Sequence, residues 1–349
     1  MSVATPSVDA VVLAGTHQDR RRLINGLNKA FLPLGNSLSL QYVLDALCRS
    51  GKVGRVFVVG PSEELRRHLS GDGGRYHVVP EKGRMLDNAL EAYRSAESEA
   101  AQDGAAASDR LYLYLTSDIP LAVPEAIADF VDRAALLEKS LGQRIDLVAG
   151  VSDEVALAPF YPLTNRPGIV RPYMELKHQR LRLANIYLAR PGRIRNLEVL
   201  QQGFAARKLT QWRSVGRLIR TFLGNPAGLK GASHVAWFQA ASVFEKTGFR
   251  RLAKLARNRL DREVIERTAS AMLGCRFAAL VTPYGGLSLD IDDAADYEII
   301  RENLTIWRKH QKSLLPSFSE EAAASVEDLR PSPRPVQGPA RTGPREPVT

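Results

Sequence analysis

The chain has 349 residues, of which 44% are hydrophobic and 25% are charged. This length suits about two typical domains or one large domain with an insertion, and the composition excludes collagen-like, coiled-coil and wholly disordered proteins. Two cysteines, Cys48 and Cys275, stand far apart, which excludes a disulfide framework or a zinc module. Because the sequence has no apolar run of membrane-spanning length and residues 1–9 lack the pattern of a secretory signal, we expect a cytoplasmic protein.

Positive charge is concentrated in one part of the chain. The formal net charge is +10. Residues 177–276 contain 21 Lys and Arg but 5 Asp and Glu, so this segment carries +16 and the remainder carries −6. Such a segment is typical of proteins that bind phosphorylated ligands, anionic lipid or nucleic acid. A solvated face of helices that cover a sheet is the alternative interpretation.

Short apolar runs alternate with amphipathic segments through the first 150 residues. The pattern predicts strands at 8–14, 56–59, 77–79, 111–115 and 145–149, and helices at 38–49, from Ser62, at 85–100 and from Pro124. Strands that alternate with helices over short connections form parallel sheets with right-handed crossovers. We therefore predict an α/β fold with a doubly wound, mostly parallel, Rossmann-like sheet.

The rhythm changes after residue 150. Two extended segments, 169–176 and 181–189, flank a polar stretch and predict a hairpin, and residues 196–273 have the spacing of several basic amphipathic helices. Strands at 276–282 and 287–289 and a helix at 294–310 follow, and the Pro-rich residues from 316 onward predict a disordered tail. We expect one domain over 8–310 with its core at 8–176 and 276–310, an insertion at 177–275 that comprises a hairpin strand and a basic, mainly helical segment, and a tail at 316–349.

Small and basic residues follow the first predicted strand, at the edge where open parallel sheets bind ligands. Leu13, Ala14 and Gly15 end this strand, and small residues there let backbone N–H groups approach a phosphate. Arg20, Arg21, Arg22 and Lys29 come next and provide the positive charge that a triphosphate requires. By its type alone, Lys29 could equally be an ordinary solvated lysine.

Carboxylates follow two other predicted strands. Asp118 comes after strand 111–115, and Asp290 and Asp292 come after the last strand. Carboxylates from separate strand ends can hold one Mg²⁺ against phosphate oxygens, although Asp118 could instead cap the helix that starts near Pro124. Two neighbouring acids are better explained by the closing helix, Asp293 as its N-cap and Asp296 as an acid in its first turn.

Four motifs occur in a characteristic order. They are V-V-L-A-G at 11–15, N-K-A-F-L-P-L-G at 28–35, S-D-I-P-L at 117–121 and D-I-D-D-A-A-D-Y at 290–297. In these motifs the chain resembles the MobA-like nucleotidyltransferases, which include the molybdenum-cofactor guanylyl- and cytidylyltransferases and the sugar-phosphate nucleotidylyltransferases. The resemblance covers most of residues 8–150 and 276–310 and implies the nucleotide-diphospho-sugar transferase type of fold.

The resemblance also implies roles for individual residues. The loop of Leu13, Ala14 and Gly15, with Arg20 and Lys29, would bind the nucleotide phosphates; Asp118 with Asp292, or alternatively Asp290, would bind the metal; and segment 80–88, with Gly83 and Asn88, would border the nucleobase. The first loop reads G-T-H-Q-D-R-R-R and lacks the second glycine that usually precedes the arginine in this family, so which arginine contacts the triphosphate stays open. Asn185 lies either near the acceptor or in a structural hydrogen bond.

These observations predict a Mg²⁺-dependent nucleotidyltransferase that joins NMP from an NTP to a phosphorylated acceptor and releases pyrophosphate. Lys29, Arg20 and Asp118 are the expected catalytic residues. The acceptor would be a small molecule or lipid-linked, and the basic segment could touch an anionic membrane; nothing in the sequence favours nucleic acid strongly. The alternative is a catalytically weak α/β scaffold whose basic segment binds anionic lipid or nucleic acid.

Overall fold

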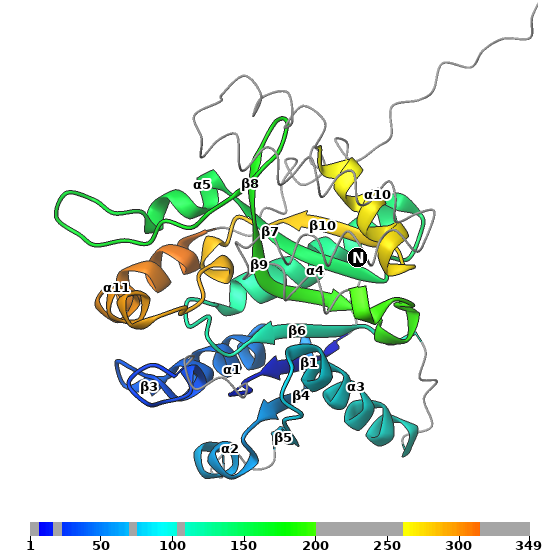
Figure 1. Cartoon of the computed structure of the whole chain (residues 1–349), viewed down its shortest axis with the longest axis horizontal. Coiled ribbons are helices and arrows are strands. Elements are labelled where there is room, and N and C mark those ends of the chain that lie inside the picture. The colour runs from blue at the N-terminus through cyan, green and yellow to red at the C-terminus, as the bar shows by residue number, and fades with distance from the viewer. Residues whose placement is uncertain (1–6, 17–22, 70–74, 103–108, 200–260, 315–349) are drawn as a thin grey trace, which may run out of the picture. The chain divides into compact units, whose positions relative to one another are not determined.

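A computed structural model describes residues 7–16, 23–69, 75–102, 109–199 and 261–314 (Figure 1). Three expectations lie outside these described residues: the contacts of Arg20, Arg21 and Arg22, the helices expected between 200 and 260, and the tail from 316 onward. All described residues belong to one unit of the chain.

The centre of the fold is a mixed, mostly parallel sheet. Its strands are β1 (Val8–Leu13), β4 (Val53–Gly60), β5 (Tyr76–Pro80), β6 (Tyr112–Thr116), β7 (Leu147–Asp153), β8 (Met174–Glu175), β9 (Arg180–Ala189) and β10 (Phe277–Val281). Their order is β10-β7-β9-β6-β1-β4-β5, and β8 pairs with β9. β1 pairs in parallel with β4 and β6, β4 with β5, and β7 with β10. The predicted α/β sheet is therefore confirmed.

The predicted hairpin is present, with its second strand close to the expected bounds and its first strand limited to Met174–Glu175. Met174 of β8 lies opposite Leu181 of β9. β9 then continues between β6 and β7 and is antiparallel to both, with Ala184, Ile186 and Leu188 buried. The sequence pattern groups this strand with the insertion, whereas the structure places it in the middle of the sheet, because the pattern of a strand does not specify which strands it pairs with.

Helices flank the sheet (Figure 1). The main ones are α1 (Ser39–Arg49), α2 (Ser62–Leu69), α3 (Met85–Gln102), α4 (Pro124–Leu141), α10 (Arg262–Leu273) and α11 (Ala294–Ser313). Ala92 and Ala96 of α3 and Leu273 of α10 share one apolar cluster with Val11 and Phe57, so both helices cover the same face of the sheet. α4 packs against α1 and α11. Among the described helices, none combines the length and apolar character needed to cross a membrane.

A second apolar cluster lies around α11 and fixes the loops at the carboxyl end of the sheet. Trp307 of α11 packs edge-on against Phe160, with ring centroids 5.2 Å apart. The same cluster contains Leu32, which follows the short 3₁₀ turn η2 (Lys29–Phe31), and Ile291. This cluster therefore sets the distance between the turn that carries Lys29 and the acidic residues before α11.

The strand expected at 287–289 is wrong. Residues Gly285–Ser288 form a 3₁₀ turn, η5, and are fully buried. A Cβ on Gly285 would lie 2.1 Å from the carbonyl oxygen of Ala156, and the N–H of Gly286 donates to Gln311 Oε1 at 2.9 Å. Backbone groups held by close packing and by a helix side chain cannot join a strand ladder.

Candidate active site

The first loop connects the end of β1 to the turn that carries Lys29. Asn28 Nδ2 donates to the carbonyl of Ala14 at 2.9 Å, and Asn28 Oδ1 accepts the N–H of Ala30 at 2.9 Å. The amide side chain thus caps η2 and joins it to the strand end at the same time. Lys29, the first residue of η2, is held at the carboxyl edge of the sheet by this arrangement.

Gly15 contacts the predicted nucleobase segment directly. A Cβ at position 15 would lie 2.6 Å from Asn88 Nδ2 and 2.9 Å from Glu81 Oε2, so any larger residue would require these two side chains to move. Glu81 Oε2 accepts the N–H of Thr16 at 2.8 Å. The structure therefore brings two sequence-predicted residues, Gly15 and Asn88, together, and adds Glu81, which the sequence analysis covered only as part of segment 80–88.

The remaining predicted residues of this region lie nearby in the chain. Leu13, the last residue of β1, is paired with Val59 of β4 and Thr116 of β6, so it ends the strand between two neighbours. Gly83 has a φ of 101°, a backbone conformation that glycine adopts without strain, and it shapes the turn that precedes α3. Arg20 lies outside the described residues.

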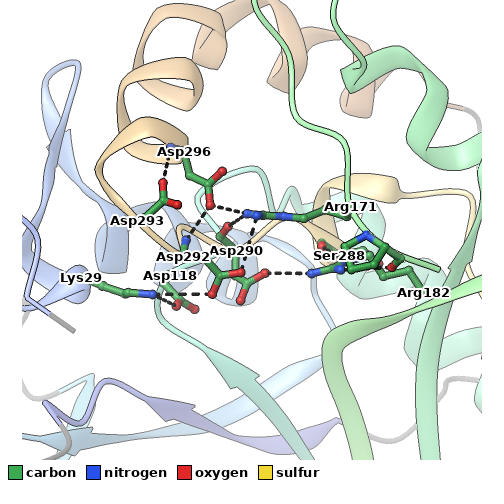
Figure 2. Close-up of polar contacts among 10 residues, drawn as sticks. Lys29, Asp118, Arg171, Arg182, Ser288, Asp290, Asp292, Asp293 and Asp296 are labelled. Atoms are coloured by element: carbon green, nitrogen blue, oxygen red, sulfur yellow. Dashed lines mark hydrogen bonds and ion pairs between the residues drawn. The ribbon is translucent and has the colours of Figure 1, made fainter. Parts of the chain in front are cut away.

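Lys29 lies between two of the predicted metal-binding carboxylates (Figure 2). Its Nζ is 3.9 Å from Asp118 Oδ2 and 3.8 Å from Asp292 Oδ1. The lysine side chain is 15% exposed, which is inconsistent with an ordinary solvated lysine. The N–H of Ile291 donates to the Asp118 carbonyl at 3.0 Å and joins the two acidic segments.

Asp118 is in a position that disfavours its negative charge. Burial raises the pKa of its carboxyl above the ordinary value, and the charge of Asp290 raises it further, while Lys29 opposes the shift. Its Oδ1 atom is buried without a hydrogen-bond donor among the described side chains. Asp118 does not cap α4, because the N-cap residue is Val123 and no side chain bonds there. The positive charge of Lys29 therefore does not fully offset the cost of burying the Asp118 carboxylate.

Two arginines contact the acidic residues from the opposite side (Figure 2). Arg182 Nη2 lies 3.4 Å from Asp290 Oδ1, whereas Arg171 Nη1 lies 3.6 Å from Asp292 Oδ2. Both arginine side chains are nearly buried. The sequence analysis did not select either of them, because they stand 119 and 108 residues from Asp290 in a segment without a motif.

The start of α11 confirms two sequence predictions. Asp293 is the N-cap residue, and its Oδ1 accepts the N–H of Asp296 at 2.9 Å. Asp296 is the acid of the first turn. Its Oδ2 also accepts the N–H of Asp292 at 3.0 Å and a bond from Arg171 at 2.5 Å, so it does more than complement the helix dipole.

Comparison with known proteins identifies the family. A model of the MobA-like NTP transferase domain matches residues 10–271. The chain belongs to this family. Family membership makes it an NTP-using transferase of the nucleotidyltransferase class and confirms the resemblance seen in the four motifs.

One solved structure, with a TM-score above 0.5, shares the fold. A hypothetical transferase from Thermus thermophilus is 23% identical, with 83% of this chain and 99% of that chain covered and a TM-score of 0.55. A nucleotidyl transferase from Methanothermobacter, 13% identical over 86% and 98% of the two chains, and a CMP:2-keto-3-deoxy-manno-octonic acid synthetase, 12% identical over 86% and 99%, both have a TM-score of 0.43. No curated protein matches the sequence.

The described part of the basic segment of this MobA-like chain is largely paired with acids. Arg190 Nη1 lies 2.6 Å from Glu138 Oε1, and Arg180 Nη1 lies 3.2 Å from Glu154 Oε1. Intramolecular ion pairs therefore account for part of the positive charge that the sequence analysis attributed to a partner. The basic residues between 200 and 260 lie outside the described residues.

Asn185 is buried in β9, and its Nδ2 atom has no hydrogen-bond partner within the described portion of the chain. Buried polar groups normally have such a partner. Nδ2 is therefore an unused donor in the sheet of this MobA-like domain.

Proposed function

We propose that this protein is a Mg²⁺-dependent nucleotidyltransferase that transfers NMP from an NTP to a phosphorylated acceptor and releases pyrophosphate. The observation that supports it most directly is the position of Lys29, 3.9 Å from Asp118 and 3.8 Å from Asp292. A lysine beside two carboxylates at the carboxyl edge of a parallel sheet combines a phosphate-binding cation with metal-binding oxygens. These are the groups that phosphoryl transfer requires.

The nucleotide would lie along the first loop. The backbone of Leu13, Ala14 and Gly15 ends β1 beside this edge, and Lys29 neutralises phosphate charge there. Arg20 is the proposed second cation. Gly83 and Asn88 border the nucleobase in this proposal, because Asn88 already lies against Gly15.

The carboxylates suit Mg²⁺, although no group of three or more His, Cys, Asp or Glu side chains in the described chain forms a metal cage. Mg²⁺ commonly binds one or two carboxylates and completes its shell with water and substrate phosphates. Asp118, with a buried Oδ1 that lacks a donor, and Asp292 are the proposed ligands. Asp290 is the alternative ligand. Each of the two acids faces one arginine, Asp290 facing Arg182 and Asp292 facing Arg171, and Asp292 is preferred because it also lies 3.8 Å from Lys29. Bound Mg²⁺ supplies positive charge at the phosphate oxygens.

The proposed reaction needs no protein nucleophile. An oxygen of the acceptor phosphate forms a bond to the α-phosphorus while the bond from that phosphorus to the bridging oxygen of the β-phosphate breaks, and pyrophosphate leaves with the electron pair. Lys29 offsets the charge that develops on pyrophosphate, and the first loop orients the triphosphate. Catalysis then consists of positioning and charge neutralisation.

In this proposal the acceptor is defined only as a phosphorylated molecule. The unused donor of Asn185 supports a place for an acceptor beside β9. A lipid-linked acceptor, contact with an anionic membrane and a cytoplasmic location remain predictions, because they depend on charge at 200–260 or on sequence composition.

A ligand screen followed by a turnover assay tests the proposal. The melting temperature is measured with each of the four NTPs, with Mg²⁺ or with EDTA; a ligand at 100 times its Kd stabilises the folded state by about 2.7 kcal/mol. Pyrophosphate release is then measured with sugar phosphates and alditol phosphates as acceptors. We expect one NTP to stabilise the protein in Mg²⁺ and one acceptor to give turnover. NTP binding without turnover on any acceptor would instead support the catalytically weak scaffold.

A further inference from the structure

We infer that Arg171 is a positioning residue for the reaction. It holds residues 290–296, called here the acidic loop, in the conformation in which Asp292 faces Lys29 and Asp118. This inference rests on the proposed function, because a metal and nucleotide site is what requires Asp292 in that place.

One guanidinium group contacts three residues of the acidic loop. Arg171 Nη2 donates to the carbonyl oxygen of Asp290 at 2.7 Å and to Asp296 Oδ2 at 2.5 Å. Its Nη1 lies 3.6 Å from Asp292 Oδ2. The side chains of Arg171 and Asp296 are 12% and 10% exposed, so their contact is shielded from water and from the screening effect of salt.

The contacts of Arg171 lead to the backbone of Asp292. Asp296 Oδ2 accepts from Arg171 and also from the N–H of Asp292. The N–H of the preceding residue, Ile291, donates to the Asp118 carbonyl at 3.0 Å. The backbone N–H groups of Ile291 and Asp292 are therefore both held by hydrogen bonds. The Asp292 carboxylate itself is 41% exposed and lies beside Lys29.

Electrostatic repulsion explains why the acidic loop needs this arginine. Asp290, Asp292, Asp293 and Asp296 lie within seven residues, and like charges so close together disfavour a compact conformation. A guanidinium group presents several donors in a planar fork and can contact three acceptors at once, whereas the ammonium of lysine is a single compact point charge. Charge at position 171 is therefore insufficient without the geometry of arginine.

Arg171 acts on the reaction by fixing the position of Asp292. Arg182 contacts the chain before and at the start of the acidic loop, where its Nε donates to the Ser288 carbonyl at 2.9 Å and its Nη2 lies 3.4 Å from Asp290 Oδ1. A matched control is Arg166, which lies in the same connection before β8 but donates to the carbonyl of Pro159 at 3.3 Å, outside the acidic loop.

The test compares Arg171→Lys and Asp296→Asn with Arg166→Lys in the full-length protein. The first readout is amide hydrogen exchange of the metal-free protein. We expect the peptide that contains residues 288–296 to exchange at least about 10-fold faster in both test variants, while peptides from β1 and β6, and every peptide of the control, keep the wild-type rate. Asp296→Asn changes only charge and one acceptor, so it carries the test if Arg171→Lys does not fold.

The second readout is the affinity for Mn²⁺, titrated without nucleotide as a spectroscopic substitute for Mg²⁺. Loss of a group that orients metal ligands commonly weakens metal binding by about 10- to 100-fold, and we expect a loss of at least 10-fold in both test variants. Faster exchange with unchanged Mn²⁺ affinity would overturn the inference, because Arg171 would then be merely structural. Unchanged exchange would overturn it as well. Failure of the proposed function is distinguishable, since the wild-type protein itself would then bind no Mn²⁺ and show no turnover.

Discussion

Replacing Asp118 with asparagine removes the charge of this carboxylate but keeps its shape. The attraction between Asp118 and Lys29 at 3.9 Å amounts to about 4 kcal/mol at an effective dielectric constant of about 20. Burial and the charge of Asp290 nevertheless raise the pKa of Asp118 above its ordinary value, so folding as a whole disfavours the charged form. Without metal, the neutral variant should therefore be at least as stable as the wild-type protein.

Activity should change in the opposite direction. Removing one charged group from a preorganised phosphate site commonly costs about 100-fold or more in rate, and Asp118→Asn should lose at least that much Mg²⁺-dependent pyrophosphate release. The assay measures kcat/KM with the preferred NTP and the melting temperature in EDTA. The matched control is Asp45→Asn, whose carboxylate is 62% exposed and pairs with Arg49 one helical turn away; such surface pairs contribute about 0.3–0.5 kcal/mol.

Two results would refute this reasoning. Turnover within 10-fold of wild type would remove Asp118 from the site, and a loss of more than about 2 kcal/mol in the free energy of unfolding would mean that the carboxylate stabilises the metal-free fold. Asp292→Asn should behave like Asp118→Asn. If Asp290→Asn is inactive and Asp292→Asn is active, the proposed chemistry stands with Asp290 as the second ligand.

Three further predictions concern other parts of the chain. Lys29→Ala should lower kcat/KM by about 100-fold and Lys29→Arg should restore only part of it, because the two cations present different donor geometries to phosphate; equal values for the three proteins would contradict its role. Arg190→Ala should cost about 1.5–3 kcal/mol in urea unfolding, because Glu138, which is 24% exposed and paired with Arg190 at 2.6 Å, would keep only the N–H of Ile145 as a donor among the described residues, and a loss below about 0.5 kcal/mol would contradict this. Burial raises the pKa of Cys275 from 9.0 to about 12, so at pH 8 iodoacetamide should modify it about 1,000-fold more slowly in the folded than in the unfolded chain. Because the unfolded thiol ionises first, stability should also fall as pH rises from about 9 to 12, and a pH-independent stability over that range would refute the shift.

Local patterns were enough to predict the α/β class and to bring the candidate site residues to one edge of the sheet. Apolar runs such as 8–14 report burial on both faces of a sheet, and polar residues that follow such runs must lie at its carboxyl edge when the strands are parallel. Gly15 and Asp118 were predicted for this reason, since each lies two residues past the end of its strand, whereas Lys29 was selected by its charge and by the N-K-A-F-L-P-L-G motif at 28–35. The motif that contains Asp292 was sufficient to place an acid near them.

Contacts between segments that are distant in the chain could not be predicted from the sequence. The position of β9 between β6 and β7, the turn in place of a strand at 285–288 and the contacts of Arg171 with residues 119 and 125 positions away all depend on packing across the whole chain. Which of Asp290 and Asp292 lies beside Lys29 also depends on tertiary packing. Both acids follow the same strand with one residue between them, and only the structure shows that Asp290 faces Arg182 whereas Asp292 lies between Lys29 and Arg171, because the orientation of the acidic loop depends on its contacts with Arg171 and Asp118.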